Sequence, residues 1–384
     1  MAVQPSAGAG SRLITLEFGR GIAALLVVLY HYEFYTTEYL GSPPSWGTLF
    51  EGGHAGVEYF FVLSGFIIYY VHRSDIGNVG RLSNFYIKRF IRIVPMYWIV
   101  ISLSCLSFAL FPTWGSKKEL DAYGIFCDYL LIPRDGQLIL EPAWTLKREV
   151  LFYAIFSAII LTPKLGIAAF VFWQVSVLIA NFLFFIWNWH LSGLFVYFLD
   201  IHNIGFGVGV FCAWLVTNNL RLSINAGAVA LLIGCLGVLG VMGFEWLAND
   251  NFAGRQTVSE EIVLSGLYTA SFAFIILGSV CLELSLGLKI SRHLVLFGAS
   301  SYMLYLIHDP LESLLMKLIS TQHVKPYFND NTAFLFAVVV AVAMAIYLHI
   351  KLEMPVTKLL GQKWLQKGKA VQRSNAQVIF RRRI

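Results

Sequence analysis

The chain has 384 residues, of which 58% are hydrophobic and only 13% are charged, with a formal net charge of +6. A soluble globular domain carries about 25% charged residues. This composition therefore leaves too little polar surface for a water-soluble fold, and the surplus apolar side chains must face lipid. Soluble enzymes and soluble binding modules are excluded, and we predict an all-α polytopic transmembrane bundle.

Hydrophobic segments follow one another along almost the whole chain. A membrane-spanning helix needs about 20 mostly apolar residues, and runs this long and solidly apolar are helices rather than barrel strands. We expect about ten spans in one membrane domain, residues 12–355, between a short segment 1–11 and a basic tail 356–384. The expected spans are 18–37, 55–72, 93–112, 144–162, 166–187, 195–216, 225–244, 262–284, 294–316 and 332–353.

Basic residues gather on one side of this arrangement. The loops and chain ends on the side of the two termini hold most of the lysines and arginines, whereas the opposite loops hold few. The positive-inside rule then places both termini in the cytoplasm. A charge asymmetry of this kind indicates contact with anionic lipid head groups rather than with nucleic acid.

The five cysteines indicate neither a disulfide framework nor a metal site. Four of them lie in apolar stretches, where a thiol behaves as a small hydrophobic group, and only Cys127 lies in a polar loop. No group of cysteines and histidines has the spacing of zinc ligands. We therefore expect no metal and no permanently bound cofactor.

Ionisable residues inside the expected spans are candidate functional residues, because each costs about 3 kcal/mol or more at the centre of a membrane helix. Arg20 and His31 are eleven residues apart in the first span, so they share one helix face about 16 Å apart. Glu149 and Tyr153 are i, i+4 neighbours at the outer start of the fourth span. Both pairs also have a structural interpretation: a snorkelling arginine with a core histidine, and an interfacial belt.

Two further groups complete the candidate set. Tyr302, Tyr305 and His308 recur every three residues in the ninth span and form a stripe facing the bundle interior, as packing contacts or as part of a site. Arg89 and Arg92 are one turn apart in the loop after the second span, at the cytoplasmic surface. Guanidiniums at this spacing suit phosphate oxygens, although an ordinary positive-inside flank has the same composition.

Five short blocks occur in a fixed order between about residues 12 and 355, nearly the whole chain. They are Arg20 with His31, Phe60-Phe61-Val62-Leu63-Ser64-Gly65, Arg89 with Arg92, the stretch Trp144 to Tyr153 with Leu146, Glu149 and Phe152, and Ser301 to His308 with Tyr302, Tyr305 and Leu306. Together they resemble the acyltransferase-3 family of membrane-bound O-acyltransferases. Thr145 departs from the family pattern, which has a serine at that place.

The resemblance implies an acetyl or short-acyl transfer from cytoplasmic acyl-CoA, a co-substrate, to a sugar hydroxyl. The acceptor would be an envelope or exported glycan, free or lipid-linked, of the exopolysaccharide, nodulation-factor or O-antigen type. The protein would then be a multi-pass protein of the bacterial inner membrane. Its expected partners are the lipid bilayer, acyl-CoA, the glycan acceptor and proteins of polysaccharide assembly.

Acyl transfer to an alcohol needs a base that takes the hydroxyl proton, and histidine titrates near neutrality. We expect His31 to be this base and Glu149 either to orient His31 or to hold the sugar. A covalent acyl-histidine intermediate stays open. The expected substrate- and donor-binding residues are Arg20, Ser64, Arg89, Arg92, Tyr153, Tyr302, Tyr305 and His308.

Two other functions fit the same sequence. Ten spans with buried ionisable residues also suit a proton-coupled secondary transporter of a polar or anionic substrate. However, transporters often contain inverted repeats, and the two halves of this chain show no convincing repeat. A non-catalytic scaffold of an envelope-polymer assembly is the third interpretation, and it predicts that His31 and Glu149 tolerate replacement.

Overall fold

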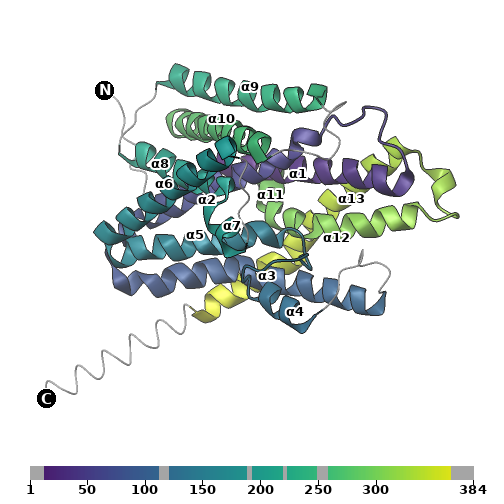
Figure 1. Ribbon diagram of the computed structural model, residues 1–384, viewed down its shortest axis with the longest axis horizontal. Helices are drawn as coiled ribbons and strands as arrows, with labels where there is room; N and C mark the ends of the chain where they lie inside the picture. The colour runs from purple at the N-terminus through teal and green to yellow at the C-terminus, as the bar shows by residue number, and fades with distance from the viewer. Residues whose placement is uncertain (1–12, 112–120, 188–192, 219–222, 249–257, 365–384) are drawn as a thin grey trace, which may run out of the picture.

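A computed structural model describes residues 13–111, 121–187, 193–218, 223–248 and 258–364 of the chain. These residues form helices and their connections, without any strand among them, which confirms the predicted all-α bundle. Figure 1 shows the long helices side by side, with the start of the first helix and the end of the last at the same end of the bundle. The segment 1–11 and most of the predicted basic tail lie outside the described residues.

Thirteen α-helices are described, together with several single turns. The helices are α1 (Ile14–Leu40), α2 (Gly56–His72), α3 (Leu82–Leu110), α4 (Ala122–Tyr129), α5 (Ala143–Leu161), α6 (Pro163–Trp187), α7 (Leu194–Leu199), α8 (Ile204–Thr217), α9 (Ile224–Ala248), α10 (Val258–Leu286), α11 (Arg292–Ala299), α12 (Ser301–Ile319) and α13 (Asp330–Leu348). The turns include the 3₁₀ turns η1 (Glu51–Ala55) and η5 (Ile201–Asn203) and a π-helical turn, His349–Glu353. The chain stays helical after this π turn as far as Trp364.

Eight described segments are long and apolar enough to cross a membrane. They are Ile14–Leu40, Glu51–Asp75, Val79–Leu110, Pro163–Trp187, Leu194–Thr217, Ile224–Ala248, Ser259–Leu286 and Asp330–Trp364. The expected spans 144–162 and 294–316, which correspond to α5 and to α11 with α12, are not among them. The count of about ten spans and the cytoplasmic termini stay predictions.

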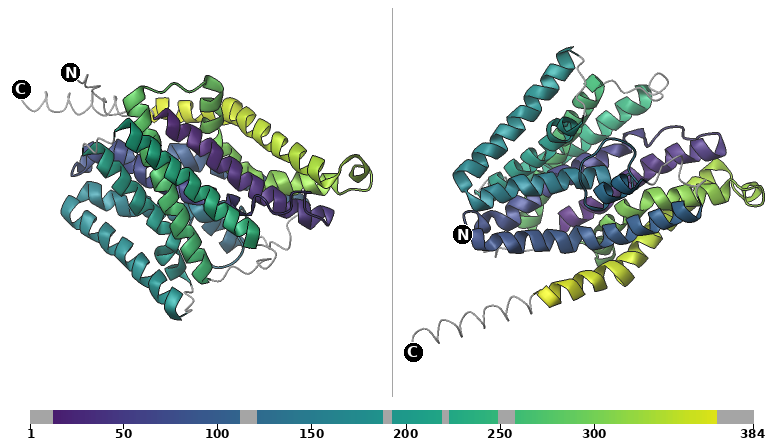
Figure 2. Two further views of the ribbon diagram at one scale, coloured as in Figure 1. Left: turned by 90° about the horizontal axis from the view of Figure 1, so that it is seen from above. Right: turned by 60° about the horizontal axis from the view of Figure 1, so that its bottom comes forward.

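The helices α5 and α12 carry several charges and are shielded by their neighbours. Lys147 and Arg148 of α5 are buried, as are Asp309 and Glu312 of α12. The helix α5 packs against α2, α3 and α6, and α12 packs against α1, α3 and α13. By contrast, α6 lies at the outer edge of the bundle (Figure 2) and exposes large apolar side chains. Helices shielded from lipid need not be apolar all round.

Two expected boundaries are wrong. The span 294–316 was expected to be continuous, but α11 ends at Ala299 and α12 begins at Ser301. At the break, the Ser300 hydroxyl donates to the Phe297 carbonyl at 2.8 Å, as serines do where they compete with helical hydrogen bonds. The second case is α3, which begins at Leu82, so Arg89 and Arg92 lie on a helix rather than in a loop.

Glycines set the close packing of α2 against its neighbours. A Cβ atom at Gly53 or Gly56 would overlap a backbone carbonyl of α1, and one at Gly209 of α8 would overlap the Val62 carbonyl of α2. Small residues allow membrane helices to approach this closely. Gly53 and Gly56 therefore serve the packing of η1 and α2 against α1.

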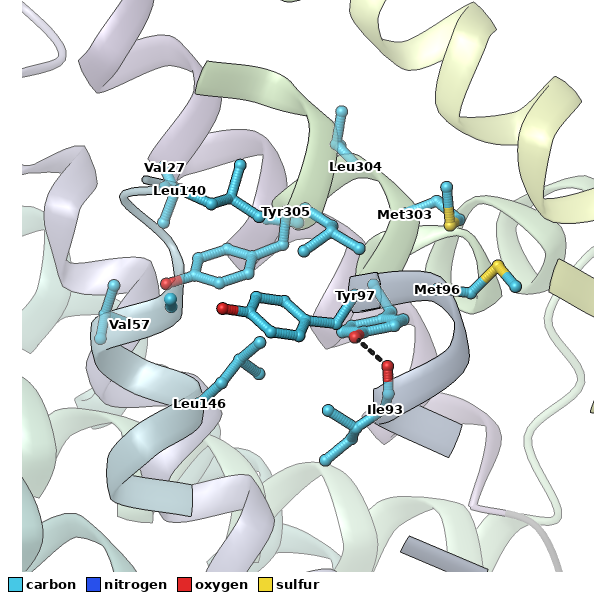
Figure 3. Packing of buried hydrophobic residues seen from close by; sticks show 14 of the residues in the cluster. Val27, Val57, Ile93, Met96, Tyr97, Leu140, Leu146, Met303, Leu304 and Tyr305 are labelled. Carbon is cyan, nitrogen blue, oxygen red and sulfur yellow. Dashed lines mark hydrogen bonds between the residues drawn. The ribbon is translucent and has the colours of Figure 1, made fainter. Parts of the chain in front are cut away.

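The core forms where α1, α2, α3, α5 and α12 meet. Figure 3 shows Val57 of α2, Leu146 of α5 and Tyr305 of α12 converging on this region. The Tyr302 hydroxyl donates to the Ile93 carbonyl of α3 at 2.7 Å, the dashed contact at Ile93 in Figure 3. A buried hydroxyl needs such a partner, so this bond fixes the rotation of α12 relative to α3.

A buried ionic cluster holds the connection between α4 and α5. The Asp128 carboxylate, fully buried, accepts hydrogen bonds from Arg134 at 2.8 Å, from Lys147 at 2.9 Å and from the Ile139 amide at 3.0 Å. The Asp128 carbonyl accepts from the Tyr97 hydroxyl at 2.6 Å. Burial by itself would raise the pKa of Asp128, but the hydrogen bonds to its carboxylate outweigh burial and lower that pKa. The cluster ties α3, α4 and α5 together.

We predict that Asp128→Ala lowers the free energy of unfolding by about 3–5 kcal/mol, because it leaves a buried lysine without its counter-ion. Thermal unfolding of the purified protein in lipid nanodiscs measures the loss. The control is Asp121→Asn, since an asparagine still caps Gly124 of α4. Because the pKa of Asp128 is lower in the folded protein than in the unfolded chain, its carboxylate stabilises the fold fully above the pKa of the unfolded chain, about 3.9. This stabilisation is lost as the pH falls through the pKa of the folded protein. Equal stability of Asp128→Ala and wild type would contradict this role.

Candidate active site

A cavity of about 650 Å³ lies between α1, α2, α3, α5 and α12 and reaches the helix that follows the π turn. This volume is in the range of small-molecule sites. Eight of the ten predicted site residues line it: Arg20, Ser64, Arg89, Arg92, Glu149, Tyr153, Tyr302 and Tyr305. Residues from five distant segments of the sequence are therefore brought to one place.

Three guanidiniums face this cavity, Arg20 from α1 and Arg89 and Arg92 from α3. Among the described residues, none of the three forms an ion pair with a carboxylate. Arg89 is 3.4 Å from the His72 ring nitrogen, and its Nε is buried without a hydrogen-bond partner. Arg92 is exposed, so it lies at an open mouth of the cavity. Unpaired guanidinium donors are suited to an anionic ligand.

Glu149 is held on the wall of the same cavity. Its carboxylate accepts hydrogen bonds from Ser64 of α2, at 3.1 Å, and from Tyr153 one turn along α5. The predicted shared face of Glu149 and Tyr153 is confirmed. However, Glu149 forms no hydrogen bond to His31 in the described chain, so the structure does not support Glu149 as the group that orients this histidine.

The inner end of the cavity leads through Tyr305 to two histidines. The Tyr305 hydroxyl is 2.8 Å from the Thr145 hydroxyl of α5, and its ring centre is 5.6 Å from that of His308. The ring of His308 is 4.9 Å from the ring of His31 on α1. Neither histidine lines the cavity itself. The structure thus brings all ten predicted residues into one region but leaves His31 and His308 behind Tyr305.

Hydrogen bonding distinguishes the two imidazoles. His308 is buried, and its Nδ1 lies 2.6 Å from the Tyr305 carbonyl. A carbonyl only accepts, so Nδ1 carries a hydrogen and the Nε2 of the neutral ring is an acceptor. In the part of the chain that the structure describes, no hydrogen bond engages the His31 ring, which is partly exposed. His31 is therefore free to exchange a proton with a ligand or with its neighbour.

Sequence reasoning missed a third histidine beside these two. His54 of η1 is 3.0 Å from the Glu245 carboxylate of α9, which also accepts from the Tyr268 hydroxyl of α10. The centre of the Tyr30 ring is 5.6 Å from that of His54 and 5.0 Å from that of His31. Glu245, an acid at the end of an apolar segment, was the available signal. Its partner, 191 residues away, could not be read from the sequence.

The sequence of the chain was compared with known proteins. Residues 13–350 match the model of the acyltransferase-3 family, described as an acyltransferase domain. The chain belongs to the acyltransferase-3 family. No curated protein and no solved structure gives a significant match. The family resemblance read from the five blocks is confirmed, and this protein is a multi-pass membrane acyltransferase.

We predict that the acyltransferase admits water-soluble reagents to its cavity only from the side of Arg92. Ser64→Cys, in a variant whose exposed Cys235 is replaced by alanine, should react with an anionic, membrane-impermeant thiosulfonate, because guanidiniums attract the reagent. Inside-out and right-side-out vesicles separate the two faces. The control is Val28→Cys, at a fully buried position of α1. Labelling of Ser64→Cys from both faces, or from neither, would show that the cavity does not have one open mouth.

Proposed function

We propose that this acyltransferase transfers an acetyl or another short acyl group from cytoplasmic acyl-CoA to a hydroxyl of an envelope or exported glycan in a bacterial inner membrane. The observation that carries the proposal is the cavity with unpaired guanidiniums at its mouth and a histidine pair beyond its inner end. An acyl-CoA has the matching asymmetry, with several phosphates at one end and the reactive thioester at the other.

The donor would enter with its phosphates at Arg89 and Arg92. These residues are one turn apart on a single helix, and guanidiniums bind phosphate oxygens with two parallel hydrogen bonds. Arg20 lines the same cavity and lies within electrostatic reach of Arg92, so it would contact the donor further along. The thioester would then point towards Tyr305.

The chemical step needs a base near the thioester. His31 would take the proton of the acceptor hydroxyl while the oxygen attacks the thioester carbonyl. A new C–O bond forms, the C–S bond breaks, and the departing thiolate receives the proton. His308 contacts His31, and its Nδ1–H bond to the Tyr305 carbonyl holds its ring in place. It would keep the His31 ring directed at the acceptor, as a second group commonly orients a catalytic histidine.

Replacing the base should stop transfer without unfolding the protein. We expect His31→Ala to lower the acetylation of the cell's surface glycan by about 10²–10⁴-fold, the usual contribution of a general base. Mass spectrometry of the isolated glycan measures this, with membrane levels of the variant checked by immunoblot. The control is His293→Ala, on α11 and outside the cavity. A His31→Ala strain with a fully acetylated glycan would remove this histidine from catalysis.

The donor site can be tested apart from the chemistry. We expect the double substitution Arg89→Ala and Arg92→Ala to weaken binding of radiolabelled acetyl-CoA to purified protein by about 10²–10⁴-fold, because each charged hydrogen bond contributes about 1.5–3 kcal/mol. The control removes two exposed lysines elsewhere, Lys164→Ala with Lys351→Ala. Equal loss in both variants would mean that only overall charge attracts the donor, and unchanged binding in the arginine variant would place the donor elsewhere.

A further inference from the structure

A second cavity, of about 490 Å³, lies by the connections that precede α5 and α7. The second cavity touches α5 at Trp144 and Arg148, whereas Arg89 of the first cavity lies over the Tyr153 ring, about two to three turns further along the same helix. The second cavity therefore lies at the N-terminal end of α5, away from the arginine mouth. Its wall includes Arg134, Trp144, Arg148, Tyr197, Asp200 and His202.

The cationic groups in this wall are paired with carboxylates, and Asp135 and Glu261 add two further acids to it. Arg148 donates to Asp200, which also lies 2.6 Å from His202. The other ring nitrogen of His202 is 3.3 Å from Glu58 of α2, and Arg134 is held by Asp128. Unlike the first cavity, this wall holds no unpaired guanidinium group among the described residues. An anionic ligand therefore gains little here.

Two aromatic rings and planar polar groups alternate in the same wall. The Arg148 guanidinium lies 4.7 Å from the Trp144 ring centre and 5.5 Å from that of Tyr197. Arg148 is 6% exposed, and its Nε has no hydrogen-bond partner. Trp144 is only partly buried. A sugar ring matches this surface, because its C–H face packs on an aromatic ring while its hydroxyls both donate to carboxylates and accept from guanidinium N–H groups.

A thin partition separates the two cavities. Phe61 lines the first cavity. The centre of its ring is 6.1 Å from that of Trp144 and 5.9 Å from that of His202, both in the wall of the second cavity. Thr145, next in sequence to Trp144, shares a hydrogen bond with Tyr305. A ligand in the second cavity would therefore lie one layer of side chains from the inner end of the first.

We propose that this second cavity binds a neutral sugar unit of the acceptor glycan. The assignment deepens the proposed function and rests on it for the role of acceptor, but sugar binding itself needs no donor. The anionic donor would then bind at unpaired arginines, and the uncharged acceptor would bind at a wall whose cationic groups already have carboxylate partners.

The test is saturation-transfer NMR on the full protein in lipid nanodiscs, which avoids sugar-based detergents. The probes are maltotriose, cellotriose and chitotriose. We expect ring C–H signals from at least one of them, and a Kd about fivefold weaker in Trp144→Leu, since an aromatic contact contributes about 1 kcal/mol. The matched control is Trp98→Leu, an exposed tryptophan of α3 outside both cavities.

A second variant distinguishes a loss of sugar binding from a folding defect in Trp144→Leu. Val196→Trp adds bulk to the wall without removing a side-chain hydrogen bond, and it should abolish the signal by filling the cavity. The variant Arg89→Ala with Arg92→Ala should keep sugar binding, so that failure of the donor proposal is seen separately. The assignment is overturned if no trisaccharide binds the wild type, or if the signal persists unchanged in Trp144→Leu and Val196→Trp.

Discussion

A charge within the low-dielectric interior of a membrane bundle must have a partner, because an unpaired buried ion costs several kcal/mol. By this constraint, the charged residues of the protein fall into those with a partner and those without one. Asp128 with Lys147, and Arg148 with Asp200, satisfy each other and hold helices together. Arg89 has no carboxylate partner in the described chain and faces a cavity instead. The paired charges hold helices together, and the unpaired guanidinium at the cavity indicates where an anionic ligand supplies the missing partner.

Much of the site could be predicted because it depends on local spacing. Helical periodicity places Glu149 beside Tyr153 and puts Tyr302 and Tyr305 on one buried face, whatever the rest of the chain does. The family blocks add the order in which such faces occur. Eight of the ten predicted residues therefore line one cavity, although the sequence alone contains no distances between helices.

What could not be predicted depends on contacts between distant segments. Glu149 accepts from Ser64 of another helix and not from His31, and Glu245 is the carboxylate that holds His54. Such pairings follow from how helices cross, which the hydrophobic pattern does not encode. The charges of α5 and α12 lower their hydropathy, whereas in the structure those charges are covered by neighbouring helices.

The π turn His349–Glu353 sets the rotational phase of everything that follows it. Glu353, Thr357 and Gly361 recur every four residues and, with Trp364, present one stripe to the arginine cavity. Each residue added to or removed from a helix turns the part beyond it by about 100°. A π turn contains one residue more than the α-helical repeat requires. Deleting a single residue there would leave the part of the helix before the turn packed against its neighbours but would rotate Trp364 away from the cavity wall. The π turn therefore lets one helix present two differently oriented faces, one to the bundle and one to the cavity.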